Sequence, residues 1–130
     1  MARYLVDTQV WLWLQAEPER VDPSLLARLS DSAHELLLSA ASSWEIAIKH
    51  ARGRLELPAP PERYVPDRMR ASGTTALAIE HAHTLRVASL PPHHRDPIDR
   101  MLVAQAQTLG IAIVTADDAF TPYDVEVLRA

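Results

Sequence analysis

Four acidic residues stand where elements of secondary structure are expected to begin or end: Asp7, Glu45, Asp99 and Asp117. Carboxylates gathered in a cleft repel one another, and either protonation or a hard divalent cation relieves the repulsion. Oxygen ligands select Mg²⁺ or Mn²⁺ over zinc or copper. A bound Mg²⁺ that keeps several waters polarises a phosphate and lowers the pKa of water. Such a cluster therefore predicts phosphodiester hydrolysis by metal-activated water.

The strongest local signal is a helix followed by a buried strand. Asp96 is expected at the N-cap of the helix, with a proline at the first helical position and Asp99 at the third, where it faces the positive end of the helix dipole. Gly110 is expected to end the helix in the left-handed conformation. The apolar run 111–114 then predicts a buried parallel strand, and Asp117 follows its carboxyl end.

The rest of the chain predicts alternating strands and helices. The further expected strands are 4–6, 35–38, 75–79 and 125–128, and the further expected helices are 10–15, 23–32, 39–52, 67–71 and 80–88. This order predicts an α/β fold, a three-layer α/β/α sandwich with a mostly parallel sheet, formed by residues 1–130 as one domain. In such a sheet the strand ends and the following helix starts share one edge, so the four acids are expected to converge there.

Each acid also has a purely structural explanation. Glu45 would complete a capping box with Ser42, three residues earlier, and Asp99 would only complement a helix dipole. Asp7 would cap the helix that follows it, and Asp117 would form an Asx-turn. These explanations stay open for each acid alone, and only the convergence of all four favours a metal site.

Composition limits the other possibilities. The net charge of −4 argues against tight nonspecific binding of nucleic acid, although acids that surround a cation do not exclude a nucleic-acid substrate. The absence of cysteine excludes disulfides and thiolate sites and suits a reducing cytoplasm. No apolar run approaches the roughly 18 residues of a membrane span. We therefore expect a soluble cytoplasmic protein without a membrane partner.

Four blocks of the chain resemble the PIN-domain ribonuclease toxins of the VapC type. They are VDTQVWLW at 6–13, SWEIAIK at 43–49 with a following Gly-Arg-Leu, HRDPIDR at 94–100 with a following Ala-Gln-Ala, and VTAD at 114–117 with a later Phe and Tyr. The blocks lie in the family order and at familiar distances. The resemblance implies a PIN-like fold and a Mg²⁺-dependent endoribonuclease in which Mn²⁺ substitutes, the toxin of a type II toxin-antitoxin pair.

The resemblance also implies roles for individual residues. The positions that match the acidic catalytic and metal-binding site are Asp7, Glu45, Asp99 and Asp117, and the supporting positions are Thr8, Asp96, Arg100 and Thr115. Two positions depart from the common pattern: Gln9 stands where a histidine is common, and Ile98 where a phenylalanine is common. Neither is an acid, so the expected site is unchanged.

Basic residues near Glu45 have two interpretations. Lys49, four residues later, is either a plain helix ion pair or a supporting residue that contacts phosphate. Arg52 and Arg54 form either a solvated helix end or a basic rim beside the cleft.

The other polar candidates are weaker. His93 and His94 are neighbours in an extended segment, so their side chains are expected to point apart, into a solvated or RNA-facing loop. His81 and His83 are expected on the surface, and Asp118 is expected to be a turn acid.

The first helix is apolar on almost all sides, which predicts that a partner protein binds to it. One of its residues, Trp11 or Trp13 in particular, is expected at a protein interface, although these tryptophans and Trp44 would also fit a core. The resemblance implies a homodimer, a cognate antitoxin and an RNA substrate. A nonhydrolytic RNA-binding or regulatory domain and a metal-dependent phosphohydrolase of small molecules remain as alternatives.

Overall fold

A five-stranded parallel sheet organises the computed structural model, which describes residues 2–130. The strands are β1 (Arg3–Val6), β2 (Glu35–Ser39), β3 (Thr75–Leu77), β4 (Ala112–Thr115) and β5 (Val127–Arg129). Their order across the sheet is β3-β2-β1-β4-β5, and each neighbouring pair is parallel. The predicted α/β fold with a mostly parallel sheet is confirmed.

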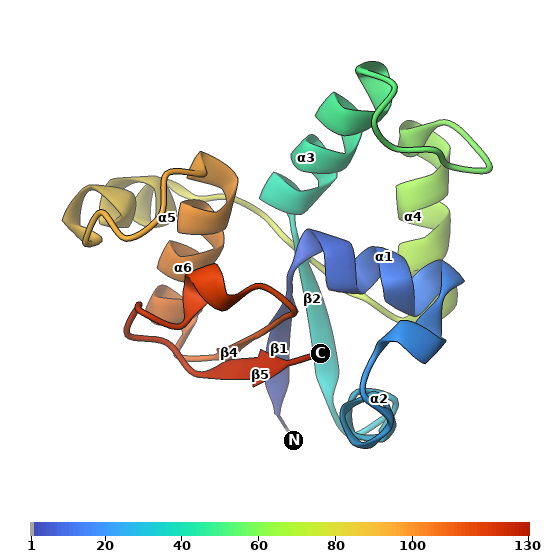
Figure 1. Cartoon of the computed structure of the whole chain (residues 1–130), viewed down its shortest axis with the longest axis horizontal. Helices are drawn as coiled ribbons and strands as arrows, with labels where there is room; N and C mark the ends of the chain where they lie inside the picture. The colour runs from blue at the N-terminus through green and yellow to red at the C-terminus, as the bar shows by residue number, and fades with distance from the viewer. Residues whose placement is uncertain (1) are drawn as a thin grey trace.

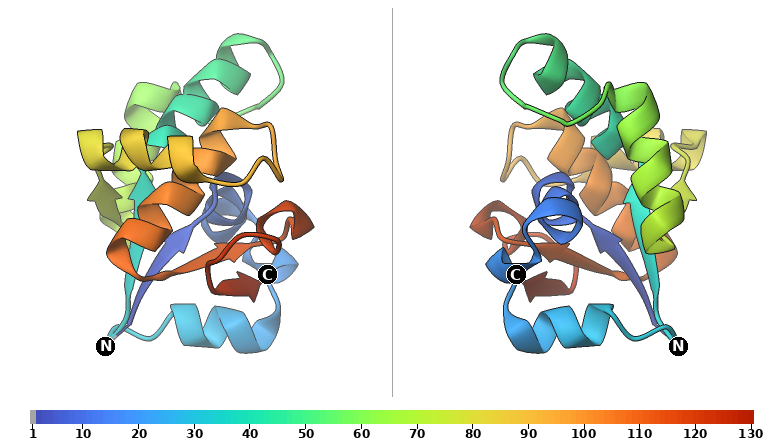
Figure 2. Two further views of the ribbon diagram at one scale, coloured as in Figure 1. Left: turned by 90° about the vertical axis from the view of Figure 1, so that its left-hand side faces the viewer. Right: turned by 90° about the vertical axis from the view of Figure 1, so that its right-hand side faces the viewer.

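Helices cover both faces of the sheet (Figures 1 and 2). They are α1 (Thr8–Ala16), α2 (Pro23–Leu29), α3 (Ala40–Ala51), α4 (Pro61–Ser72), α5 (His81–Arg86) and α6 (Pro97–Leu109), with the short 3-10 helices η1 (Pro18–Arg20), η2 (Val87–Ser89) and η3 (Asp118–Phe120). Within the described chain, none of the helices has the combination of length and apolar composition that crossing a membrane requires.

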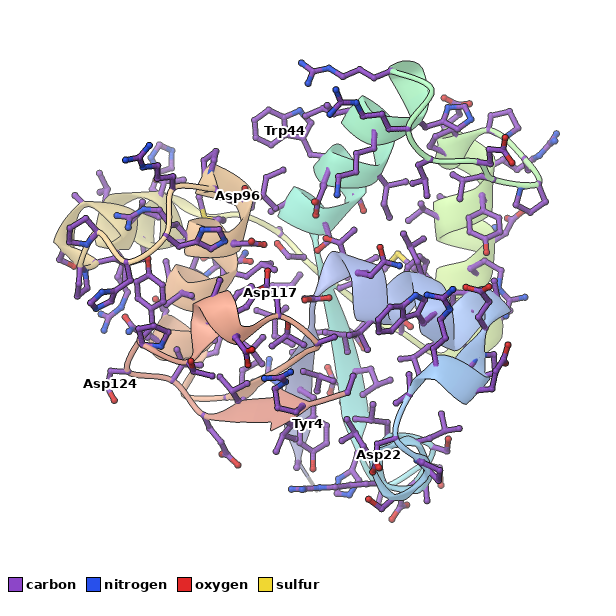
Figure 3. All side chains as sticks on the ribbon, viewed as in Figure 1. Tyr4, Asp22, Trp44, Asp96, Asp117 and Asp124 are labelled. Carbon is purple, nitrogen blue, oxygen red and sulfur yellow. The ribbon has the colours of Figure 1, made fainter. Side chains whose placement is uncertain are left out.

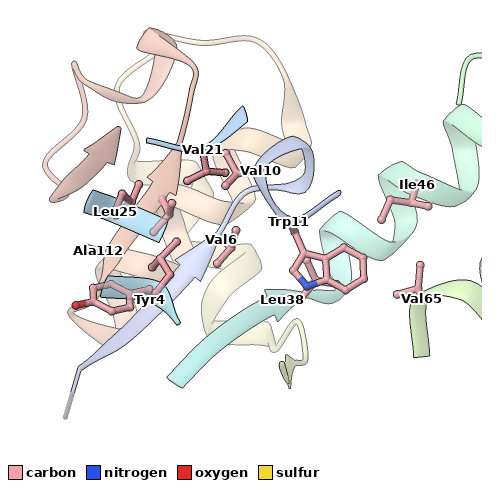
Figure 4. Packing of buried hydrophobic residues seen from close by; sticks show 12 residues of the cluster. Tyr4, Val6, Val10, Trp11, Val21, Leu25, Leu38, Ile46, Val65 and Ala112 are labelled. Carbon is pink, nitrogen blue, oxygen red and sulfur yellow. The ribbon is translucent and has the colours of Figure 1, made fainter. Parts of the chain in front are cut away.

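The core is divided by the sheet because successive strand residues point to opposite faces. Tyr4 and Val6 pack with Val10, Trp11 and residues of α2, α3 and α4 on one face, as Figure 4 shows. Leu5 packs on the other face against α6. Both faces of β1 are therefore buried, which fixes the direction in which the strand delivers Asp7.

The carboxyl ends of the three central strands lie side by side. The β1 and β4 registers pair Val6 with Val114, and the Asp7 amide donates to the Val114 carbonyl at 2.9 Å. Helix α1 begins directly after Asp7, and α3 begins directly after Ser39 at the end of β2. The first residues of α1 and α3 therefore lie at this carboxyl edge of the sheet.

The predicted start of α4 was wrong. The helix begins at Pro61 rather than near residue 67, because a proline with its fixed backbone angle fits the first helical position. Pro66 lies inside the helix, where a proline costs about 3 kcal/mol. Burial of Val65 in the core helps to offset that cost. The proline-rich composition of this stretch had concealed the first part of the helix.

The predicted capping box at the start of α3 was also wrong. The N-cap is Ser39, whose Oγ accepts a hydrogen bond from the Ala41 amide at 3.0 Å. Strand β2 runs into the helix without a loop, so Ser42 is buried inside the helix and Glu45 lies in its second turn. Glu45 therefore does not cap α3, and the capping explanation of this acid is removed.

Smaller differences concern element ends. Strand β3 stops at Leu77, two residues before its predicted end, and β5 covers Val127–Arg129 rather than 125–128. Helix α6 begins and ends as predicted, with Asp96 at the N-cap and Gly110 in the left-handed conformation at φ 66°.

Candidate active site

The four predicted acids line one cavity of about 650 Å³ at the carboxyl edge of the sheet. Asp7 comes from the end of β1, Glu45 from α3, Asp99 from the first turn of α6 and Asp117 from the segment after β4. Asp96, Asp118, Lys49 and Arg54 also line this acidic cavity. Figure 3 labels Asp96 and Asp117, which approach it from two different segments.

Asp7 is the most buried of the four acids. Its Oδ1 accepts from the Val10 amide at 3.0 Å, and its Oδ2 accepts from the Thr115 hydroxyl. Burial raises the pKa of Asp7 above its ordinary value, although these two hydrogen bonds oppose the rise. The carboxylates of Glu45 and Asp117 raise it further. A cation in the cavity would relieve this penalty on the ionised form.

Thr115 connects two acids. Its Oγ1 donates to Asp7 Oδ2 and accepts from the Asp117 amide at 3.0 Å. Thr8, the other predicted hydroxyl residue, also lines the cavity, and its buried Oγ1 has no hydrogen-bond partner among the described residues. Both hydroxyl residues therefore lie where the sequence predicts.

We expect Thr115→Val to destabilise the protein by about 1 to 3 kcal/mol, because the buried Asp7 oxygen loses its donor and the Asp117 amide loses its acceptor. Urea unfolding measures the change. Thr115→Ser keeps the hydroxyl and is expected to stay much closer to the parent protein. Equal stability of the valine and parent proteins would show that this hydroxyl does not hold the two acids.

Asp99 has an unpredicted partner. His94 Nε2 lies 2.7 Å from Asp99 Oδ2, and both side chains are mostly buried. The prediction of a solvated or RNA-facing His94 was wrong. The loop before α6 folds back, and the backbone amide of His94 donates a hydrogen bond to the Tyr123 hydroxyl at 2.9 Å. Burial and the nearby Asp96 carboxylate raise the pKa of Asp99 to about 6, and the His94 hydrogen bond opposes that rise.

Three side chains form a compact set of possible metal ligands. One ligand atom from each of His94, Asp99 and Asp117 lies within 4.8 Å of the other two. Asp7 and Glu45 line the same cavity outside this set. The sequence offered one usable signal for His94, its position two residues before the Asp96 cap, but only the folded loop turns its ring toward Asp99.

Glu45 is paired with Lys49. The Lys49 Nζ lies 2.7 Å from Glu45 Oε2, so the predicted helix ion pair is confirmed. The Lys49 side chain is half exposed while Glu45 is mostly buried, which leaves the ammonium group at the cavity opening.

Arg100 does not line the cavity, contrary to what its place beside Asp99 in the motif suggests. Its guanidinium donates to the carbonyl oxygens of Pro91 at 3.0 Å and Val87 at 3.1 Å, and to the Tyr123 hydroxyl at 3.3 Å. Longer contacts reach the carbonyls of Leu90 and His94. Arg100 therefore fixes the loop that carries His94 into the site.

Two further expectations need correction. His83 is buried rather than on the surface, because its Nδ1 accepts from the Glu80 amide and its ring faces Gln105 of α6; His81 is exposed as predicted. The exposed tryptophan lies in α3 rather than in α1. Trp11 is fully buried and Trp13 is partly covered by Arg20, whereas Trp44 is 60% exposed.

The chain is similar to known proteins in sequence and in fold. Residues 4–126 match a family model described as PIN domain. The chain is 53% identical over 58 residues to Ribonuclease VapC16 of Mycobacterium tuberculosis (strain ATCC 25618 / H37Rv), and that match covers 45% of this chain and 41% of the relative. The chain thus spans less than half of this relative's length.

Solved structures share the fold at low sequence identity. VapBC2 from Rickettsia felis, bound to a DNA fragment from the promoter, matches with a TM-score of 0.73 and 10% identity over 98% of each chain. VapBC-5 from Mycobacterium tuberculosis matches with a TM-score of 0.62 and 17% identity over 100% of each chain.

Proposed function

Because the chain belongs to the PIN-domain family, we propose that it is a metal-dependent endoribonuclease and the toxin component of a type II toxin-antitoxin pair. The observation that carries the proposal is the single cavity lined by Asp7, Glu45, Asp99 and Asp117. A relative that shares 53% identity over part of the chain is named a ribonuclease, which supports RNA as the substrate.

The cavity fits a hard divalent cation. Its donors are mainly carboxylate oxygens, three ligand atoms are already within 4.8 Å of one another, and burial raises the pKa of both Asp7 and Asp99. These features suit Mg²⁺, with Mn²⁺ as a substitute. When bound, such a cation supplies Lewis-acid stabilisation of phosphate charge and a more acidic water.

The side chains divide the work in the following way. Asp7, Asp99 and Asp117 would hold the metal, and Glu45 would orient the water for attack on the phosphorus. Thr115 aligns Asp7, and His94 aligns Asp99.

Three cavity residues support that arrangement. Asp96 starts α6 and so sets the direction of Asp99. Lys49, at the opening, contacts the phosphate of the substrate, and the Thr8 hydroxyl lies free to bond to a water or to the substrate.

Partner proteins follow from the same proposal. An acidic cavity attracts a segment that carries arginine or lysine, as an antitoxin would when it silences the site. A solved structure with this fold, VapBC-5 from Mycobacterium tuberculosis, is a member of the VapBC family of toxin-antitoxin systems, which supports a cognate antitoxin. We also propose that the toxin forms a homodimer.

A panel of structured RNAs tests the function. The purified protein is expected to cut internal bonds in the presence of Mg²⁺ or Mn²⁺ and to lose this activity in EDTA, and mapping of the new ends identifies the cleaved bonds. RNA binding without cleavage at saturating Mn²⁺ would instead indicate a regulatory domain. Hydrolysis of a generic phosphomonoester with the RNA intact would indicate a small-molecule phosphohydrolase.

A further inference from the structure

Trp44 is exposed without an evident structural reason. Its side chain is 60% exposed, and the other large apolar side chains that are exposed among the described residues, Ile79 and Leu85, lie outside α3. Exposed indole area is costly in water, so a lone exposed tryptophan beside a candidate active site points to a ligand that covers it. Figure 3 shows Trp44 projecting from α3 on the side where Asp96 and the start of α6 lie.

A second cavity continues the acidic cavity along the same face of α3. It measures about 170 Å³ and shares Glu45, Lys49, Arg54 and Asp96 with the acidic cavity. Ile48 lines it one helical turn after Trp44, and residues four apart lie on the same face of a helix. Trp44 therefore borders a path that leads from the surface to the four acids.

Cationic side chains lie along this path. Arg52 and Arg54 both line the second cavity, and among the described residues neither has an acidic partner within ion-pair distance. Lys49 also lines this path and is paired with Glu45. The two arginines are thus available for an anion in a chain whose net charge is −4.

These features together fit single-stranded RNA. Proteins bind unpaired nucleotides by stacking bases on aromatic rings while basic side chains follow the phosphates. Protein interfaces also use tryptophan and arginine as anchors, but here the two arginines line a path that continues into the acidic cavity, which favours RNA over a protein partner. We propose that an unpaired base of the RNA stacks on Trp44 while Arg52 and Arg54 contact the phosphates that lead into the acidic cavity.

This inference rests on the proposed ribonuclease function for the identity of the ligand, so the test separates binding from cleavage. The probe is a fluorescein-labelled single-stranded RNA of about ten nucleotides, a length within the range that such grooves cover. Binding is measured by fluorescence anisotropy in EDTA, so that metal-dependent cleavage does not affect the measurement. Trp44→Ala is expected to weaken binding about 5- to 150-fold, the loss that removal of one stacked base produces.

Matched variants show whether stacking is the cause. Trp44→Phe is expected to bind close to the parent protein, while Trp44→Leu, which is apolar but cannot stack, is expected to lose affinity as the alanine variant does. Leu85→Ala removes another exposed apolar side chain, 72% exposed on α5, and is expected to change nothing. A blunt RNA duplex offers no unpaired base, so its binding is expected to be unaffected by Trp44→Ala.

The arginines are tested by salt dependence. Arg54→Ala is expected to reduce the slope of log affinity against log salt concentration by about one, as the loss of one phosphate contact does. Arg3→Ala removes an exposed arginine at the amino end of β1, the end of the strand opposite Asp7, and is expected to leave the slope unchanged.

Specific outcomes overturn the inference. If Trp44→Ala binds the RNA with the affinity of the parent protein, the inference is wrong, whether or not the protein cleaves RNA. If light scattering shows that Trp44→Ala changes the oligomeric state while RNA binding is unchanged, the inference is also wrong. The tryptophan then belongs to a protein interface. If Trp44 proves necessary for RNA binding but no RNA is cleaved with Mn²⁺, the inference stands and the proposed ribonuclease function fails.

Discussion

Asp99→Asn is expected to lower RNA cleavage about 10²- to 10³-fold, the loss typical of removing one preorganised electrostatic group from a catalytic site. Asp99 lies in the first turn of α6, where it faces both His94 and the cavity that holds the other acids. An amide of the same shape keeps the packing but removes the charge that the proposed metal requires. Initial cleavage rates in Mn²⁺ measure the effect.

Asp118→Asn is the matched control. Asp118 is the next acid after Asp117 and lines the same cavity, but it is exposed and is paired with Arg129. Its loss is expected to change cleavage little. Equal activity of Asp99→Asn and the parent protein would remove Asp99 from the proposed site, and a large loss in Asp118→Asn would show that net charge alone explains both results.

Stability distinguishes a lost catalytic group from a lost fold. The pKa of Asp99 is about 6 in the folded protein against 3.8 ordinarily, so the ionised form opposes folding. The penalty is absent below pH 4, grows as the pH rises and is complete above pH 6. At pH 7 without metal, Asp99→Asn is therefore expected to be more stable than the parent by roughly 1 to 3 kcal/mol, and the difference should disappear near pH 4. Denaturant unfolding at several pH values measures this difference.

Arg100→Ala is expected to cost about 2 to 4 kcal/mol of stability, because hydrogen bonds from a charged donor are worth more than neutral ones and the freed carbonyls lose their partner. The guanidinium joins the carbonyls of Val87 and Pro91 to the Tyr123 hydroxyl, and Tyr123 in turn accepts from the His94 amide. The variant should release the loop that holds His94 against Asp99. Misplacement of that pair by about 1 Å would lower cleavage roughly 100-fold, although Arg100 itself lies outside the cavity.

Two variants qualify the Arg100 prediction. Arg100→Lys keeps the charge but cannot reach several acceptors at once, so only a small part of the stability should return. Tyr123→Phe removes one acceptor of Arg100 and the partner of the His94 amide, and it should show a smaller loss of the same kind. Parent-like stability and cleavage in Arg100→Ala would show that the loop is held by other contacts.

The sequence by itself determined the elements that depend on neighbouring residues. Asp96 and Pro97 start α6 and Gly110 ends it because caps and left-handed glycines act within one turn of the chain. Parallel strands place their carboxyl ends on one edge, so the meeting of Asp7 with Asp117 followed from the order of elements alone. Local rules misled where two of them competed, as in the proline-rich start of α4.

The tertiary structure decided what depends on residues far apart in the chain. Ser39 rather than Ser42 caps α3 because β2 runs into the helix without a loop. His94 turns toward Asp99 because Arg100 and Tyr123 hold the preceding loop. Trp11 is buried because it packs with residues of the sheet, α3 and α4, whereas Trp44 lies on an exposed face of α3. Local sequence sets where an acid stands on its element, but packing between elements sets which side chains face it.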